Sequence, residues 1–178
     1  MNPHDELLSL TNLFPSSEAL FLKAEHIPSA VTPEPYKTML VHDHHMTVAM
    51  ETFHKCTVDV RVLGQKLDGD LYCREIVLVK QGTETIVQYG LVRFNLSYVT
   101  SEVRDEILAQ KTPLGRILIN HNVLRHIDLG AILEITAGPR LARHFQMPVG
   151  GVTYGRLATI FCNRQPAVDL LEISTVLQ

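Results

Sequence analysis

The feature of this chain that most restricts its fold is a series of apolar segments with period two, separated by very short turns. This pattern predicts strands over residues 58–63, 71–79 and 85–98. Turn sequences stand between them at Asp68-Gly69-Asp70 and Gln81-Gly82-Thr83. Connections of this length cannot carry a parallel crossover, so the sequence predicts an antiparallel sheet.

The second half of the chain returns to strand character after a helical stretch. We expect a strand over residues 123–136 with a bulge or bend at Gly130. A final pair, residues 152–162 and 167–176, is joined by the turn sequence Asn163-Arg164-Gln165-Pro166. Short helices are expected near four segments, residues 36–41, 47–54, 101–108 and 114–118. The sum is an α+β fold, one antiparallel sheet with helices gathered on one side or at one end.

Length and composition favour one domain spanning residues 1–178. The chain has 178 residues, of which 46% are hydrophobic and 20% charged, enough to bury a core of its own. Leucines at helical spacing over residues 5–13, followed by Pro28, Pro33 and Pro35, make residues 1–35 an N-terminal helical and loop arm. Residues 141–147 are ambiguous between helix and loop.

Charge and cysteine content narrow the range of partners. Sixteen basic against 19 acidic residues give a net charge of -3 without a basic cluster, which argues against nucleic acid and against a polybasic membrane patch. Cys56, Cys73 and Cys162 form no CxxC pair, so neither a disulfide framework nor a zinc site is expected. No apolar stretch is long enough to span a bilayer and the start lacks a signal-peptide pattern, so we expect a cytoplasmic protein.

Arg74 is the most informative single residue, because it lies inside an apolar run typical of a buried strand. Alternation places Tyr72, Arg74, Ile76 and Leu78 on one face of that strand. If that face lines a cavity, the guanidinium can bind a carboxylate through two parallel N–H donors. The alternative is an exposed face with Arg74 paired to an acidic residue on a neighbouring strand.

Glu172 is the second charge embedded in an apolar strand. Because burial favours the protonated form of a carboxyl group, a buried Glu172 could donate a proton or bind a hydroxyl. The alternative is a glutamate near a strand end that reaches solvent.

The turn His42-Asp43-His44-His45 could suggest a metal site. It lacks the His-Glu-x-x-His pattern, and His44 and His45 are adjacent, so we expect no metal. The turn is expected to line or cap a pocket with His44 and His45, the alternative being a solvated turn.

Three separated segments together resemble the chorismate pyruvate-lyase (4-hydroxybenzoate synthase) family, as a divergent member. They are His45-Met46-Thr47, Tyr72-Cys73-Arg74-Glu75-Ile76 and Thr112-Pro113-Leu114-Gly115-Arg116, followed by Glu172 in the last strand. The resemblance implies a sheet enclosing a ligand cavity beneath helices, with no cofactor. It implies catalytic roles for Arg74 and Glu172. It also implies substrate contacts from Met46 and Leu114. We further expect substrate contacts from Thr47 and Tyr72 in the same segments, and from His44 and His45, where the turn departs from the family's pattern.

Three functions follow as hypotheses. The first is a carbon-oxygen lyase that eliminates pyruvate from chorismate and leaves a hydroxybenzoate, in most cases 4-hydroxybenzoate. The second is a non-catalytic domain that binds a small aromatic carboxylate. The third is an enzyme of the same fold acting on another carboxylate substrate. In each, the partner is a small carboxylate molecule, and the chain is a monomer or a homodimer.

Overall fold

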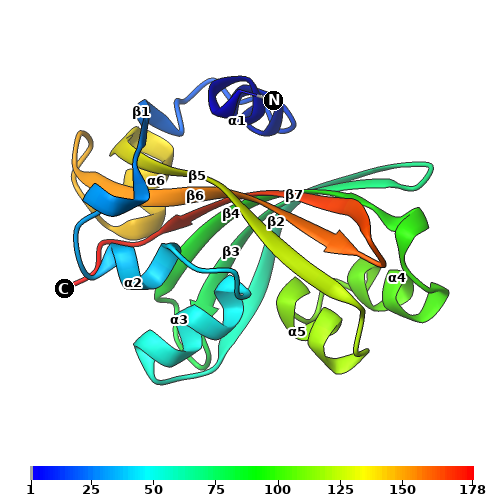
Figure 1. The fold of residues 1–178 in the computed structure, drawn as a ribbon. Helices are drawn as coiled ribbons and strands as arrows, with labels where there is room; N and C mark the ends of the chain where they lie inside the picture. The colour runs from blue at the N-terminus through cyan, green and yellow to red at the C-terminus, as the bar shows by residue number, and fades with distance from the viewer. Residues whose placement is uncertain (1) are drawn as a thin grey trace.

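A single twisted sheet forms the centre of the molecule (Figure 1). The computed structural model describes residues 2–178; Met1, with which the predicted domain begins, lies outside the described residues. Within residues 2–178 the sheet has seven strands in the order β1-β5-β6-β7-β4-β3-β2, and every neighbouring pair is antiparallel. The strands are β1 (Phe21–Ile27), β2 (Val58–Asp68), β3 (Leu71–Lys80), β4 (Ile86–Asn95), β5 (Arg125–Ala137), β6 (Val152–Cys162) and β7 (Gln165–Ser174). The predicted α+β class with one antiparallel sheet is confirmed.

The helices divide between the two faces of the sheet. They are α1 (Pro3–Thr11), α2 (Tyr36–Leu40), α3 (Met46–His54), α4 (Ser101–Leu108), α5 (Leu114–Asn120) and α6 (Pro139–Phe145). Short 3-10 helices occur at Ser29–Val31 and Leu96–Tyr98. Helices α2 to α5 cover one face, as predicted, and Figure 1 shows α1 across the sheet from them. Helix α6 packs with α1 on the second face, which the sequence did not predict.

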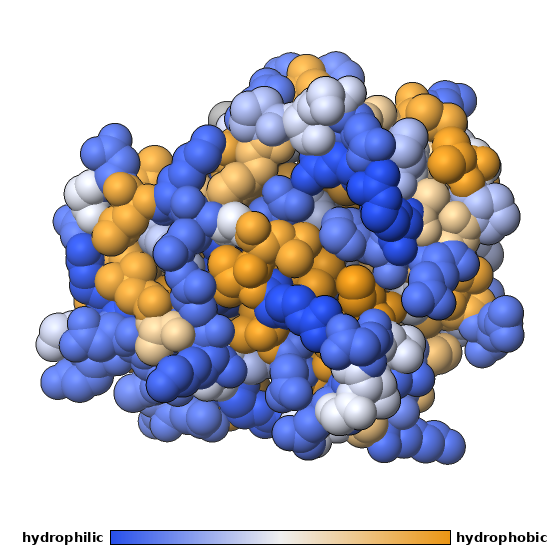
Figure 2. All heavy atoms as spheres, turned by 180° about the vertical axis from the view of Figure 1, so that it is seen from behind, coloured by the Kyte–Doolittle hydropathy of each residue, from blue (hydrophilic) through white to orange (hydrophobic). Residues whose placement is uncertain are grey.

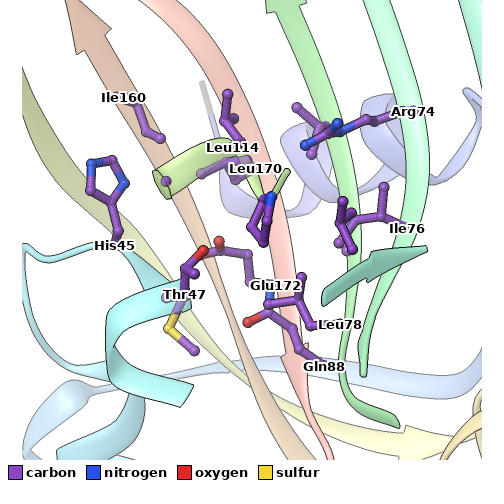
Figure 3. A pocket seen from close by; sticks show the side chains of 16 residues that line it. His45, Thr47, Arg74, Ile76, Leu78, Gln88, Leu114, Ile160, Leu170 and Glu172 are labelled. Atoms are coloured by element: carbon purple, nitrogen blue, oxygen red, sulfur yellow. The ribbon is translucent and has the colours of Figure 1, made fainter. Parts of the chain in front are cut away.

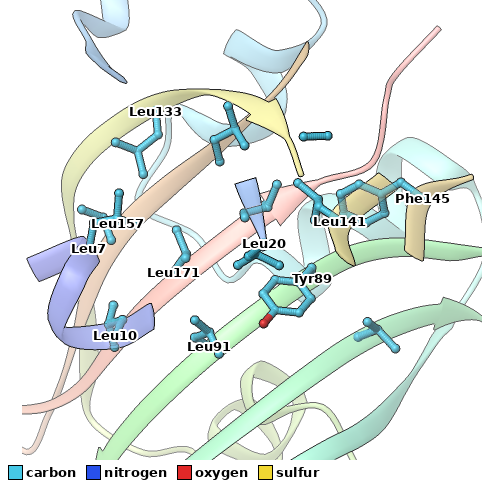
Figure 4. Close-up of a cluster of buried hydrophobic side chains, with 14 of the residues drawn as sticks. Leu7, Leu10, Leu20, Tyr89, Leu91, Leu133, Leu141, Phe145, Leu157 and Leu171 are labelled. Carbon is cyan, nitrogen blue, oxygen red and sulfur yellow. The ribbon is translucent and has the colours of Figure 1, made fainter. Parts of the chain in front are cut away.

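Alternation along the central strands separates two cores. Val77, Tyr89 and Leu171 point to the face covered by α1 and α6, where they pack with Leu10 and Leu141 (Figure 4). The intervening residues of the same strands point to the face covered by α2 to α5. This second face holds two apolar clusters, one beneath α2 and α3 and one beneath α4 and α5. The gap between these clusters is where a cavity can form.

Local sequence explains several element ends. Thr100 caps α4, because its hydroxyl accepts a hydrogen bond from the Val103 amide at 3.4 Å. The register of β5 against β6 shifts between Leu129 and Ala131, so the bulge predicted at Gly130 is confirmed. The short helices predicted after Pro35 and at Pro113 are also present.

The N-terminal segment differs from the prediction. Residues 1–35 were expected to be helical and loop, yet β1 lies within them and forms an edge of the sheet by pairing with β5. Its pattern of exposure has no period of two, so the strand signal was absent from the sequence. The ambiguous residues 141–147 belong largely to α6.

The surface carries apolar groups in separate patches. Figure 2 shows the rear of the molecule in Figure 1 as hydrophilic over most of its area, with its broadest hydrophobic patch near the centre. Within residues 2–178 no helix is long and apolar enough to cross a membrane.

Candidate functional site

A cavity lies between the two pairs of helices, over the middle of the sheet. It has an empty volume of about 450 Å³, part of which is open to solvent. Strands β2, β3, β4, β6 and β7 form its floor, and the N-terminal ends of α3 and α5 form its roof (Figure 3). The lining residues are His45, Met46, Thr47, Val60, Arg74, Ile76, Leu78, Gln88, Gly90, Val92, Pro113, Leu114, Gly115, Ile160, Leu170 and Glu172. This mostly apolar lining with a few polar groups is typical of a small-molecule pocket.

Arg74 projects into this cavity without an acidic partner. Its side chain is only 2% exposed, and its Nε and Nη1 atoms are buried without any hydrogen-bond acceptor. Burial lowers the pKa of the guanidinium, and the Tyr72 hydroxyl opposes that shift. An arginine remains charged at neutral pH even so. A buried cation with free donors is costly to the unliganded protein and favourable to an anionic ligand.

Glu172 faces the same cavity but is already paired. Its Oε2 atom accepts a hydrogen bond from Arg156 Nε at 2.8 Å, and the two residues lie directly opposite each other on β7 and β6. The predicted proton donor is therefore a hydrogen-bond acceptor for a guanidinium. Two strand spacings and two residues separate Glu172 from Arg74, which puts their Cα atoms about 12 Å apart.

Arg156 also holds the histidine turn in place. Its guanidinium, which is fully buried, donates to the carbonyl oxygens of His42 at 3.1 Å and His44 at 3.0 Å. Burial and the neighbouring Arg156 charge lower the pKa of His42. The turn that leads into α3 is thus attached to the sheet through one arginine.

His45 closes the cavity at the start of α3. Its Nε2 atom accepts a hydrogen bond from Arg125 Nε at 2.8 Å, so the proton of the neutral ring resides on Nδ1. Burial, followed by the charges of Arg125 and Arg156 and by His44, lowers the pKa of His45 from its ordinary 6.5 to about 4. The imidazole is therefore neutral at neutral pH.

A glycine allows the two roof helices to approach each other. A Cβ atom at Gly115 would lie 2.9 Å from the Cβ atom of His45 and 3.1 Å from Thr47 Oγ1, closer than side chains pack. An ion pair between Arg116 and Glu51 joins the same two helices. Leu114, Gly115 and Met46 therefore meet above the cavity because position 115 has no side chain.

A second glycine opens the floor. Gly90 lies in the central strand β4, between Ile76 on β3 and Glu172 on β7. A Cβ atom there would stand 3.2 Å from the Ile76 side chain. The missing side chain leaves space in the middle of the sheet where a ligand can lie.

Six of the eight predicted site residues line this one cavity: Arg74, Glu172, Met46, Thr47, His45 and Leu114. Two do not. The His44 side chain is exposed outside it, and only its backbone carbonyl serves the site, through Arg156. Tyr72 is buried beside the cavity, where its hydroxyl donates to Gln65 Oε1 at 3.2 Å. The predicted roles of all eight residues stay predictions.

Besides the apolar residues of the lining, the site depends on Arg156, Arg125, Gln88 and Gly90, which were not predicted from the sequence. Arg156 had a usable signal, since it interrupts an apolar strand in the same way as Arg74. Its pairing with Glu172 depends on a register shift between Ile160 and Phe161, which the sequence did not indicate. Gln88 and Gly90 carried no comparable signal.

The described residues offer no ready metal site. Within residues 2–178 no three His, Cys, Asp or Glu side chains are grouped to hold a metal ion. The apolar lining of the cavity and its few polar groups are compatible with a small-molecule ligand.

Comparison with known proteins supports the fold. No protein-family model matches the chain, and no curated protein matches it. The effector domain of PhnF from Mycobacterium smegmatis has a TM-score of 0.51 at 10% identity, covering 74% of this chain and 88% of that one. The ligand-binding domain of a protein described as a GntR-family transcriptional regulator from Bordetella bronchiseptica has a TM-score of 0.51 at 11% identity. The match covers 66% of this chain and 85% of that one. A longer PhnF structure has a TM-score of 0.52 at 10% identity, covering 77% of this chain and 66% of that one.

These findings contradict the predicted membership of the chorismate pyruvate-lyase family. No family model matches, and the similar solved structures named above include an effector domain and the ligand-binding domain of a protein described as a transcriptional regulator. Because this family assignment is wrong, the predicted reaction, elimination of pyruvate from chorismate to give 4-hydroxybenzoate, is wrong as well. The motifs misled for a physical reason: residues 71–76 and 112–116 place an arginine in the cavity and allow a close helix contact above it, and neither feature specifies a reaction.

Proposed function

We propose that this chain, acting as one domain, binds a small organic molecule through a carboxylate group on Arg74 and does not transform it. The observation that carries the proposal is the buried guanidinium of Arg74, whose Nε and Nη1 atoms have no hydrogen-bond partner. A carboxylate has the charge and the paired oxygens that a guanidinium binds best. Similarity in fold to effector and ligand-binding domains supports a binding role.

The surroundings of Arg74 support an organic ligand rather than a free inorganic ion. Ile76, Val92 and Leu114 line the cavity beside it and can cover an apolar body. The first two amides of α3, those of Met46 and Thr47, have no acceptor within their own helix and stand at the same cavity. We further propose that the protein acts in the cytoplasm, since its three cysteines are all free.

Thermal unfolding with matched probes tests this proposal. Benzoate, cyclohexanecarboxylate and heptanoate are compared with their primary amides, which have the same shape without the charge. A carboxylate present at one hundred times its Kd should raise the Tm by about 5–10 °C, because such saturation stabilises a domain of this size by about 2.7 kcal/mol. The amides should leave the Tm unchanged.

Two variants complete the test. Arg74→Met should lose the response to carboxylates, and Arg61→Met, which removes an exposed arginine of β2, should keep it. Mass spectrometry of the mixture should recover the carboxylate unchanged. Equal shifts with acid and amide, a retained response in Arg74→Met, or no response to any acid would contradict the proposal.

A further inference from the structure

The cavity contains a second polar group without a partner, and it is of the opposite kind to Arg74. Among residues 2–178, four side-chain atoms are buried without a hydrogen-bond partner. Two of them are Arg74 Nε and Nη1, which are donors, and a third is Gln88 Oε1, which is an acceptor. Gln88 is only 3% exposed and lines the same cavity as Arg74. A protein interior seldom leaves such groups unpaired.

Gln88 and Arg74 stand at opposite ends of the cavity. Gln88 on β4 pairs with Leu78 on β3, which lies four residues along the strand from Arg74, about 13 Å away. Figure 3 shows the Gln88 amide near the Glu172 end and the Arg74 side chain well apart from both. The floor between the two ends is apolar and includes Ile76. One end of the cavity therefore has unpaired guanidinium donors, the other has the unpaired amide oxygen of Gln88, and the floor between them is apolar.

Glu172 makes the second end richer in acceptors. Gln88 pairs with Ser174 on β7, so Glu172, two residues away, is its diagonal neighbour on the same face of the sheet. Arg156 already compensates the charge of Glu172 through Oε2. A second anionic group would be repelled here, and an ammonium group would find a carboxylate that is already paired. A neutral donor fits this end best.

We propose that Gln88 determines specificity, by selecting ligands that carry a neutral hydrogen-bond donor, a hydroxyl or amide N–H, across an apolar spacer from their carboxylate. This inference rests on the proposed function, since Arg74 must hold the acid group. A ligand without the donor would leave Gln88 Oε1 buried and unpaired. Sites with such unpaired groups discriminate strongly against analogues that lack the matching hydroxyl.

Three probes of equal length test the inference by calorimetric titration. They are 6-hydroxyhexanoate, which has the donor; heptanoate, in which a methyl group replaces the hydroxyl; and 5-methoxypentanoate, whose ether oxygen can accept but not donate. The wild-type protein should bind 6-hydroxyhexanoate at least about tenfold more tightly than either of the others. Equal affinity for the hydroxyl compound and for either analogue would overturn the inference.

The variant Gln88→Leu assigns the preference to this side chain. Its preference for 6-hydroxyhexanoate over heptanoate should fall to about twofold or less, with heptanoate bound at least as tightly as by the wild type. The control Gln81→Leu, made in an exposed turn, should keep the wild-type preference. A preference that survives in Gln88→Leu would overturn the inference.

The unliganded protein provides a measurement that does not depend on binding. Because Oε1 of Gln88 has no partner, Gln88→Leu should unfold at the wild-type Tm or above it. A Tm that falls below that of Gln81→Leu would show that Gln88 is held by the protein itself and would overturn the inference. A different result would contradict the proposed function: either the wild-type protein does not bind heptanoate, or the Arg74→Met variant still binds it.

Discussion

Two buried arginines face the same side of the sheet, and their surroundings differ in one respect. Arg156 is fully buried and donates to Glu172 and to the carbonyl oxygens of His42 and His44. Arg74 is equally buried but has free Nε and Nη1 atoms. The comparison teaches that burial of a charge alone does not mark a binding residue. A buried charged side chain indicates a binding residue only when its hydrogen-bonding atoms have no partner in the protein.

Replacement of Arg156 should have the largest effect on stability. Arg156→Met leaves Glu172 buried without its partner and frees the turn at His42 and His44, so the free energy of unfolding should fall by about 3–5 kcal/mol. Urea denaturation measures this. The double variant Arg156→Met with Glu172→Leu should recover part of the loss, because no unpaired charge remains. An Arg156→Met protein as stable as the wild type would contradict the conclusion that Arg156, unlike Arg74, stabilises the fold.

Acidic pH should have the next largest effect on stability, through His45 in the turn that Arg156 holds in place. Folding lowers the pKa of His45 from 6.5 to about 4, so between these pH values the unfolded chain binds a proton that the native ring does not. Stability from this residue is therefore complete above pH 6.5 and is lost as the pH falls toward 4, by about 3 kcal/mol at most.

Denaturation at several pH values checks the effect. His45→Gln should flatten the decline between pH 6.5 and pH 4, although His42 and His144, whose pKa values burial also lowers, keep part of it. His126→Gln, a change at an exposed histidine, is the control. An unchanged slope in His45→Gln would contradict a neutral, buried His45.

Replacement of Arg74 should have the smallest effect on the unliganded protein. Because no acidic residue pairs with this cation, Arg74→Met should leave the free energy of unfolding unchanged or raise it by about 1–2 kcal/mol. Urea denaturation without ligand measures it beside Arg156→Met. A loss as large as that of Arg156→Met would mean that Arg74 is structural and would remove the distinction between the two.

The sheet and most of its helices could be predicted from the sequence, because short turns force antiparallel pairing and capping residues mark helix starts. Strand β1 could not, since an edge strand with one partner needs no alternation. Arg74 could be singled out because an arginine in an apolar strand is conspicuous.

The partner of each buried charge was harder to predict. Arg74 and Arg156 both interrupt apolar strands, and either could have paired with Glu172. The choice depends on strand order, because β6 adjoins β7 whereas β4 separates β3 from it. The family was predicted wrongly because the motifs describe an inward arginine and a close helix contact, which do not by themselves define a family. The identity of a ligand is not contained in that packing.

Gly90 has a consequence for how such a domain could change its preference. Its bare backbone lies under the cavity in the middle of the sheet, with Ile76 on one side. Alanine, valine or leucine at this position would progressively reduce the depth of the cavity, without changing Arg74 or Gln88, the residues proposed to bind the two ends of the ligand. The residue at position 90 therefore sets the width of ligand that the cavity can hold, and glycine, which has no side chain, allows the widest.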